Sequence, residues 1–456
     1  MTALAFPSGF VWGAATSAFQ IEGATTVDHR GESIWDRFAA TPGRIEDGSD
    51  GRQACEHYQR WPDDVALLRD LGLGAYRFSI AWPRIQPTGR GPANPAGLDF
   101  YDRLVDGLLA AGVAPFATLY HWDLPQPLED RGGWAARDTA LAFADYVEVV
   151  TRRLGDRVGH WMTINEPWCV AVLGYEQGAH APGHREPARA LAAAHHTLLA
   201  HGRAVPVIRA NARAAQVGIV LNLVPSAPAT DADADRDAAR WFDGFFNRWF
   251  LEPLYRGAYP DDAIADRVAR GHLAGPTLPF VADGDLAVIA TPTDFLGVNY
   301  YNPVVVRAAP GEPEAVVQVA TGAPRTDMGW EVRPEGLRAL LGRLHRDYQP
   351  ARIYITENGA AYDDPPTADG AIVDHRRIAY LRGHLGALAQ AIADGAPVAG
   401  YFHWSLLDNF EWGYGYTKRF GLIHVDFTSQ RRTPRASAQV YRAIVAANAV
   451  EPEPSP

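Results

Sequence analysis

Two glutamates in the sequence, Glu166 and Glu357, stand where runs of apolar residues end. Glu166 follows Trp161–Ile164 after one asparagine, and Glu357 follows Ile353–Thr356 directly. Two carboxyl groups that face each other can cleave a glycosidic bond, because one protonates the leaving oxygen while the other attacks the anomeric carbon. A glutamate at a strand end is more commonly an ion-pair partner, here for Arg77, so the pair alone leaves both interpretations open.

The remaining apolar runs also have polar or aromatic residues, within the run in the case of Arg77 and at or shortly after its end in the other cases. They are Gln20, Arg77, His121, Trp122, Asn165, Asn222, Asn299, Tyr300, Tyr301, Asn358 and Trp404. For any one of them, a role as a cap of a strand or of the following helix is the better explanation. Taken together, their amide, imidazole and aromatic groups suit the hydroxyl groups and C–H faces of a polyol, and they indicate one shared binding site.

The elements that would position these residues alternate along the whole chain. Eight short apolar runs predict strands at Phe10–Ala14, Ala75–Ile80, Pro115–Leu119, Trp161–Ile164, Val217–Leu221, Phe295–Val298, Ile353–Thr356 and Val398–Phe402. Amphipathic stretches predict helices at Asp63–Leu71, Leu98–Ala111, Thr139–Leu154, Pro187–Asn211, Pro334–Tyr348, His375–Ala393 and Arg435–Ala447. Eight βα units predict a single (β/α)8 TIM barrel with extended βα loops, in which the carboxyl ends of all strands meet at one face.

No break in composition divides the chain, so we expect one catalytic domain over residues 1–450. Ala227–Asp237, Ala308–Thr326 and Tyr362–Gly370 are rich in Pro, Gly, Ala and Asp, and they are predicted to be loops that decorate the barrel. The last six residues, EPEPSP at 451–456, cannot continue a helix and are expected to form a frayed tail.

Composition excludes several classes of protein. The chain of 456 residues is 47% hydrophobic and 21% charged, so it can bury a large core. A net charge of −11 and the lack of a Lys/Arg-rich run argue against a nucleic-acid or anionic-membrane partner. The start, MTALAFPSGFVWG, has no signal-peptide pattern, and no 18-residue apolar run occurs, so we expect a cytoplasmic protein. The two cysteines, Cys55 and Cys169, predict neither a disulfide framework nor a metal site.

Seven motifs give the chain a resemblance to the β-glucosidases of glycoside hydrolase family 1, in the order in which that family has them. They are FVWGAATSAFQIEG (10–23), YRFSIAWPRI (76–85), LYHWDLPQ (119–126), TINEP (163–167), GVNYY (297–301), ITENG (355–359) and WSLLDNFEW (404–412). The resemblance implies a retaining β-glycosidase in which Glu166 is the acid/base and Glu357 the nucleophile. It implies no cofactor and no metal.

The same resemblance implies the residues that hold the substrate. The expected glycone pocket consists of Gln20, His121, Trp122, Asn165, Asn299, Tyr301, Trp404, Glu411 and Trp412. Arg77 and Tyr301 are expected to orient the nucleophile. The expected aglycone side consists of Trp168, Cys169, Leu173, His180, Asn222 and Trp330.

The predicted activity is retaining hydrolysis of terminal non-reducing β-D-glucosyl residues, through a covalent glycosyl-enzyme. The substrates would be aryl or alkyl glucosides and short β-gluco-oligosaccharides, with β-galactosides and β-fucosides also accepted. A non-catalytic sugar-binding barrel and a 6-phospho-β-glycosidase are the alternatives, although the phospho branch needs cationic and hydroxyl side chains where Glu411 and Trp412 stand. A retaining mechanism requires carboxyl groups about 5–5.5 Å apart. The oligomeric state is left open.

Overall fold

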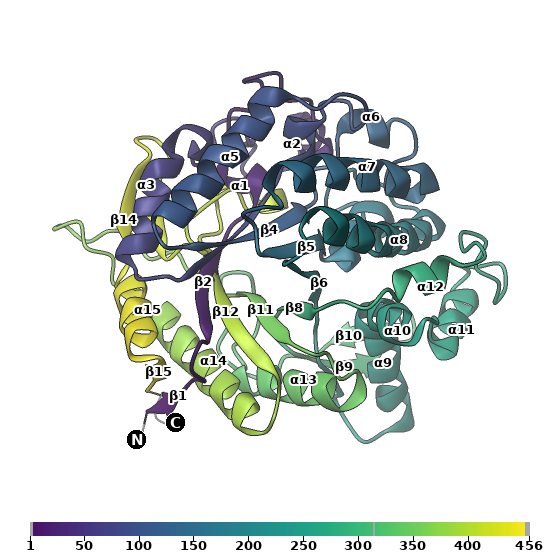
Figure 1. The fold of residues 1–456 in the computed structure, drawn as a ribbon. Coiled ribbons are helices and arrows are strands. Elements are labelled where there is room, and N and C mark those ends of the chain that lie inside the picture. The colour runs from purple at the N-terminus through teal and green to yellow at the C-terminus, as the bar shows by residue number, and fades with distance from the viewer. Residues whose placement is uncertain (1–2, 313–314, 452–456) are drawn as a thin grey trace.

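Eight parallel strands form a closed barrel at the centre of the molecule (Figure 1). The structure is a computed structural model that describes residues 3–312 and 315–451. Around the barrel the strands are β2 (Val11–Ala15), β3 (Ala75–Ser79), β4 (Ala114–Tyr120), β5 (His160–Asn165), β6 (Gln216–Asn222), β8 (Phe295–Asn299), β11 (Ile353–Asn358) and β12 (Val398–Trp404). Each predicted strand lies within two residues of its observed bounds, and the predicted (β/α)8 barrel is confirmed.

Side chains fill the interior of the barrel. Phe116 of β4 packs against Phe402 of β12 with ring centroids 4.8 Å apart, and Phe295 of β8 packs against Tyr354 of β11 at 5.2 Å. A Cβ on Gly13 would lie 2.5 Å from the Phe402 ring, so β2 has no side chain at this position. Because a packed core closes the barrel along most of its length, a ligand can enter only where the strands end.

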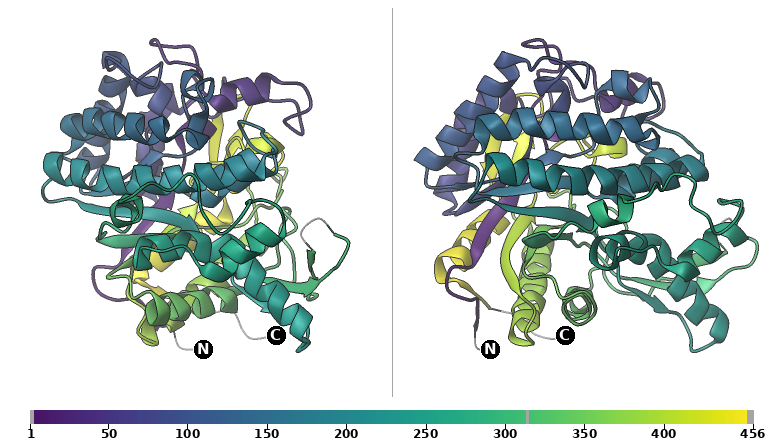
Figure 2. Two further views of the ribbon diagram at one scale, coloured as in Figure 1. Left: turned by 90° about the vertical axis from the view of Figure 1, so that its right-hand side faces the viewer. Right: turned by 45° about the vertical axis from the view of Figure 1, so that its right-hand side comes forward.

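Long helices surround the strands (Figure 1). They are α3 (His57–Asp70), α5 (Pro95–Ala110), α7 (Arg137–Leu154), α8 (Pro187–Asn211), α13 (Pro334–Asp347), α14 (His375–Ala393) and α15 (Ala436–Ala447). All seven predicted helices are present, and α8 and α14 have the predicted bounds. In both views of Figure 2 the long helices α7 and α8 lie side by side on the outside of the barrel.

Short elements complete the loops and the ends of the chain. They are α1 (Ala18–Ile21), α2 (Ile34–Ala40), α4 (Trp82–Ile85), α6 (Gln126–Glu129), η1 (Gly133–Ala135), η2 (Cys169–Glu176), η4 (Trp412–Tyr414), β13 (Ile423–Asp426) and β14 (Arg431–Pro434). Near the two termini, β1 (Leu4–Ala5) pairs antiparallel with β15 (Ala449–Val450), as Figure 1 shows at its lower left. Of the predicted tail, Glu451 has no regular structure and residues 452–456 lie outside the described part of the chain.

The prediction of loops was wrong for part of the connection between β6 and β11. Ala227–Asp237 contains most of β7 (Ser226–Pro228) and the start of α9 (Asp233–Asp243), and Ala308–Thr326 contains β10 (Val316–Gln318). β10 and β7 pair with the two sides of β9 (Val304–Ala308) in a small separate sheet. Asp233 and Asp235 lie in the first turn of α9, where carboxylates favour a helix, so the Asp-rich run starts a helix instead of a loop. Tyr362–Gly370 is irregular, as predicted.

Four further elements between β6 and β8 were not predicted. They are η3 (Gly244–Arg248), α10 (Trp249–Arg256), α11 (Asp261–Ala269) and α12 (Asp285–Ile289). Within the described ranges, no helix is both long enough and apolar enough to cross a membrane.

Candidate active site

A cavity of about 530 Å³ opens where the barrel strands end, and both Glu166 and Glu357 line it. Most of the other residues that the sequence predicted for the site also line this cavity. They are His121, Trp122, Trp168, Cys169, Leu173, His180, Asn222, Asn299, Tyr301, Trp330, Trp404, Glu411 and Trp412. Three predicted residues, Gln20, Arg77 and Asn165, are fully buried behind this lining and reach it through hydrogen bonds to Glu411, Glu357 and Asn299, respectively. The structure therefore gathers the sequence-predicted site into one place.

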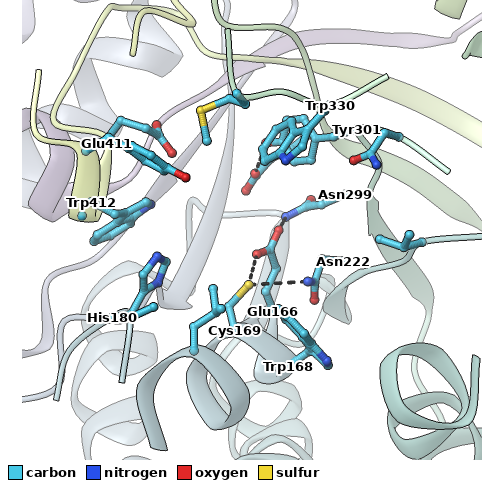
Figure 3. A pocket seen from close by; sticks show the side chains of 18 of the residues that line it. Glu166, Trp168, Cys169, His180, Asn222, Asn299, Tyr301, Trp330, Glu411 and Trp412 are labelled. Atoms are coloured by element: carbon cyan, nitrogen blue, oxygen red, sulfur yellow. Dashed lines mark hydrogen bonds between the residues drawn. The ribbon is translucent and has the colours of Figure 1, made fainter. Parts of the chain in front are cut away.

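Glu166 lies immediately after β5, where the backbone changes direction. Its φ is +48°, a left-handed conformation that few L-residues adopt and that tends to occur at functional sites. The Glu166 N–H donates to the carbonyl of Val220 on β6, which holds the turn in place. The carboxyl group accepts from Asn299 Nδ2 at 2.5 Å and from Cys169 Sγ at 3.0 Å (Figure 3). Only uncharged donors therefore contact this carboxyl group.

Glu357 lies within β11 and contacts a cation. Arg77 Nη1 donates to Oε1 of Glu357 at 2.5 Å, and the Tyr301 hydroxyl donates to Oε2 at 2.7 Å. The Arg77 side chain is fully buried, and that of Glu357 is only 5% exposed, so water screens this pair little. The predicted partners of Glu357 are thus in contact with it.

Asn165 and Asn299 connect the two carboxyl groups. Oδ1 of Asn165 accepts from Arg77 Nη2 at 2.6 Å and from Asn299 Nδ2 at 3.2 Å. Oδ1 of Asn299 accepts from the Thr356 hydroxyl at 2.7 Å, which fixes the amide so that Nδ2 faces Glu166. Each member of the network is held by a neighbour, so the two glutamates sit in a rigid frame.

The two carboxyl groups differ in their electrostatic surroundings. Burial and the negative charge of Glu357 raise the pKa of Glu166 to about 7. Burial also raises the pKa of Glu357, but the Arg77 guanidinium and the Tyr301 hydroxyl oppose this by stabilising its carboxylate. Glu357 therefore ionises first, and Glu166 keeps its proton up to about pH 7.

Aromatic rings and a third carboxyl group form the inner wall of the cavity. The His121 ring is nearly parallel to those of Trp404 and Trp412, at centroid distances of 5.9 and 6.0 Å. Burial and nearby Arg77 hold the pKa of His121 well below its ordinary value, so the ring is neutral. His121 Nε2 faces Asn165 Nδ2 at 3.2 Å, while its buried Nδ1 has no hydrogen-bond partner among the described residues.

Glu411 has no cation beside it among the described residues. The cations nearest in sequence are engaged elsewhere: Lys418 lies over the Tyr414 ring, and Arg419 binds Asp408. Gln20 Nε2 donates to Oε2 of Glu411 at 3.4 Å. Burial and the charges of Glu357 and Glu166 raise the pKa of Glu411 to about 8. This carboxyl group is therefore available to a ligand.

The outer part of the cavity is more apolar and is formed partly by residues that the sequence did not indicate. Trp168 stacks on Phe246 of η3, with centroids 4.1 Å apart and planes 28° from parallel. Tyr301 packs against Trp330 at 5.0 Å. The other lining residues that were not predicted are Arg44, Glu46, Ala179, Leu223, Val224, Phe242, Asn302, Val304, Gln318, Met328, Gly413, Tyr414 and Phe420. The aromatic run WFDGFFNRWF at 241–250 is the one sequence signal for Phe242 and Phe246.

Within the described ranges, no group of three or more His, Cys, Asp or Glu side chains is arranged to hold a metal ion. The absence of a cofactor stays a prediction.

A barrel whose open end holds two buried carboxyl groups, one paired with a cation and one not, has the arrangement that a glycoside hydrolase needs. The sequence model of glycosyl hydrolase family 1 matches residues 2–450, and the chain belongs to this family.

Solved and curated proteins agree with the assignment. The chain is 51% identical to thermostable beta-glucosidase B of Thermobispora bispora, over 98% of this chain and 91% of that protein. It is 45% identical to the bifunctional beta-D-glucosidase/beta-D-fucosidase of Bifidobacterium breve, over 97% and 98% of the two chains. The solved family 1 β-glucosidase of Thermotoga maritima superposes with a TM-score of 0.95 at 45% identity, covering 99% and 100% of the two chains. The predicted enzyme class, a β-glucosidase, is thereby confirmed.

Proposed function

We propose that the chain hydrolyses β-glucosides with retention, using Glu357 as the nucleophile and Glu166 as the acid/base, with residues 1–450 acting as one catalytic domain. The asymmetry of the two carboxyl groups carries this proposal. Glu357 is paired with Arg77, whereas Glu166 is held only by Asn299 and Cys169. A nucleophile must be ionised and a general acid protonated at the same pH, which is the distribution that these neighbours favour.

In the first step the Glu357 carboxylate attacks the anomeric carbon while Glu166 gives its proton to the leaving oxygen. Bond formation removes the negative charge of Glu357, which is one of the two main causes of the high pKa of Glu166. The pKa of Glu166 then falls, and its carboxylate can take a proton from the water that releases the sugar. One residue thus serves as acid and then as base, because the charge opposite it changes during the reaction.

The glycone is proposed to lie against the inner wall. His121 and Glu411 supply groups for sugar hydroxyls, and Trp122, Trp404 and Trp412 supply apolar surface. Gln20 and Asn165 support this wall from behind, through hydrogen bonds to Glu411 and His121. Hydroxyl donors favour the ionised form of Glu411, and such charge-assisted bonds are about twice as strong as neutral ones. A 6-phosphate would meet Glu411, which forms no ion pair with any of the described residues, so an unphosphorylated hexose is the proposed glycone.

The aglycone is proposed to lie between Trp168, Trp330 and the other outer residues, including Cys169, Leu173, His180 and Asn222. Stacked rings on this side suit aryl groups and the next sugar of a short β-gluco-oligosaccharide, including those released from cellulose. Acceptance of β-fucosides is supported by the name of the Bifidobacterium breve relative. We also propose that the enzyme works in the cytoplasm, which is consistent with the free thiols of Cys55 and Cys169.

Incubation with a 2-deoxy-2-fluoro β-glucoside that has a good leaving group tests the central assignment. We expect stoichiometric inactivation, and peptide mapping should place the label on Glu357, because the fluorine slows release of the covalent intermediate. Label on another residue would overturn the assignment. Absence of nitrophenol release from a nitrophenyl β-glucoside would favour the alternative of a sugar-binding barrel.

A further inference from the structure

The thiol of Cys169 bonds directly to the carboxyl group of the proposed acid/base. Cys169 follows Glu166 by three residues and begins the π-helix η2, a type of helix that is common at functional sites. Its Sγ lies 3.0 Å from Oε2 of Glu166, and Asn222 Nδ2 donates to Sγ at 3.5 Å from β6 (Figure 3). The sulfur is thus held on one side by an amide while it faces the carboxyl group on the other.

The direction of this hydrogen bond follows from the chemistry of the two groups. When Glu166 is ionised its carboxylate can only accept, and the Asn222 amide nitrogen can only donate, so in this state the S–H proton points to Glu166. Burial raises the pKa of the Cys169 thiol well above its ordinary value, and the charge of Glu166 adds to this effect. The thiol therefore stays protonated and remains a donor. Cys169 has no disulfide partner, so its proton is not lost to a covalent bond.

We propose that Cys169 is a positioning residue of the acid/base: with Asn299 on Oε1 and its own thiol on Oε2, it fixes the Glu166 carboxyl group and favours the ionised form. This inference rests on the role proposed above for Glu166. A donor to a carboxylate stabilises the charged form more than the neutral acid. The ionised form is the one that activates water in the second step, so the thiol keeps the proton affinity of Glu166 within the range that both steps need.

Other groups act on Glu166 from the strands and loops packed around it. The titratable and charged groups that face it are Cys169 of η2, Arg77 of β3, Glu357 of β11, Tyr301 after β8 and Glu411 after β12. Apart from Cys169, these groups also contact Glu357, the nucleophile's partners or the proposed glycone pocket. Replacement of Cys169 removes a hydrogen bond to Glu166 and leaves the contacts of Glu357 with Arg77 and Tyr301 in place.

Two pH limbs report on Glu166 in different states. The alkaline limb of kcat/KM reports its loss of a proton in the free enzyme. With dinitrophenyl β-glucoside, whose leaving group needs no proton, release of the sugar limits kcat, and the acid limb of kcat reports Glu166 in the glycosyl-enzyme. Removal of a donor to the carboxylate raises the pKa in both states. Both limbs should therefore move to higher pH, whereas a general packing defect lowers the rate at every pH.

The experiment compares Cys169→Ala, which has no donor, with Cys169→Ser, which keeps one. For Cys169→Ala we expect both limbs to move up by about half a pH unit, the size of a modest hydrogen bond. Cys169→Ser should keep both limbs at or below the wild-type positions. Cys55→Ala is the matched control, because it removes a thiol from the core that donates to the carbonyl of Asp408, away from the cavity. Its pH profile should equal that of wild type.

Melting temperatures of the three variants separate lost stability from a changed pH profile. Unmoved limbs in Cys169→Ala, or equal shifts in Cys169→Ala and Cys169→Ser, would overturn the inference. If Glu166 is not the acid/base, the result is different, because Glu166→Ala would then leave the alkaline limb of kcat/KM in place. The acid/base role of Glu166 is supported if the alkaline limb of the wild type disappears in Glu166→Ala. The positioning role of Cys169 is supported if, in addition, the limbs shift in Cys169→Ala but not in Cys169→Ser.

Discussion

Arg77 Nη1 lies 2.5 Å from Oε1 of Glu357, and this is the one contact between a cation and either proposed catalytic carboxyl group within the described residues. Arg77 donates through its other terminal nitrogen to Asn165, so the same guanidinium fixes the amide next to Glu166. A single side chain of β3 thereby helps to set the charge of one glutamate and the position of the other.

Replacement of Arg77 by Met should move the acid limb of kcat/KM to higher pH. The guanidinium lowers the pKa of Glu357, so its removal raises that pKa, and the nucleophile then becomes protonated at pH values where the wild type is active. We also expect kcat/KM at neutral pH to fall at least 100-fold, since about 2.7 kcal/mol of transition-state stabilisation gives that factor. Arg77→Lys, which keeps the charge, should shift the limb less. Equal shifts in both variants would contradict this account.

Replacement of Glu166 by Ala should affect substrates according to their leaving groups. A poor leaving group needs a proton as the bond breaks, so glycosylation with an alkyl β-glucoside should slow by about 10²–10⁴-fold. Dinitrophenyl β-glucoside should keep most of its glycosylation rate, measured as the burst of dinitrophenol. If both substrates lose the same factor, Glu166 is not the general acid.

Replacement of Glu411 by Gln tests the recognition of the glycone. Loss of the charged acceptor should reduce kcat/KM for nitrophenyl β-glucoside by about 10–100-fold, consistent with the loss of one or two charge-assisted hydrogen bonds. The wild type should hydrolyse the unmodified glucoside far faster than its 6-phosphate. A preference for the phosphorylated substrate would overturn both the role of Glu411 and the assignment of an unphosphorylated glycone.

Replacement of Phe246 by Ala tests the outer side of the cavity. Phe246 supports the ring of Trp168, so aryl β-glucosides should lose about tenfold in kcat/KM, in line with the worth of one aromatic pair. Methyl β-glucoside, which has no aromatic aglycone, serves as the internal control and should change little. A similar loss for both substrates would show that Phe246 acts on the fold or on the glycone instead.

Asp408 is expected to dominate the acid stability of the segment that carries Glu411 and Trp412. Although burial raises its pKa, the guanidinium groups of Arg435 and Arg419 outweigh that effect and lower the pKa of Asp408 to about 2. Its pKa in the unfolded chain is about 3.9, so its contribution of about 2–3 kcal/mol is fully present above that pH. The contribution is lost as the pH falls from about 4 to 2.

Urea unfolding at pH 7 of Asp408→Asn checks this expectation. The variant leaves two arginines with a neutral partner and should lose about 3–5 kcal/mol, as is typical when a buried ion pair is broken. Asp394→Asn is the control, because Asp394 forms an exposed pair with Arg338 and should change stability by less than about 1 kcal/mol. Wild-type stability in Asp408→Asn would refute the prediction.

The sequence alone determined the barrel and the identity of the proposed catalytic pair. Strand periodicity and helix signals are local, so α8 and α14 could be predicted to the residue. In a parallel barrel the carboxyl ends of all strands meet at one face, so Glu166 and Glu357 could be placed together although 191 positions separate them. The Asp-rich run that begins α9 failed as a prediction, because its composition is equally typical of loops.

Only the tertiary structure decided how the site is divided into charged and uncharged surroundings. The sequence does not indicate that Cys169 donates to Glu166, or that Phe246 stacks on Trp168, since both contacts depend on side-chain directions within the insertion after β6 and in η2. Nor does it show that Arg419 pairs with Asp408 and that, among the residues the structure describes, Glu411 has no cation beside it. Such pairings depend on distances of a few ångströms between segments far apart in the chain, because Coulomb and hydrogen-bond energies fall steeply over that range.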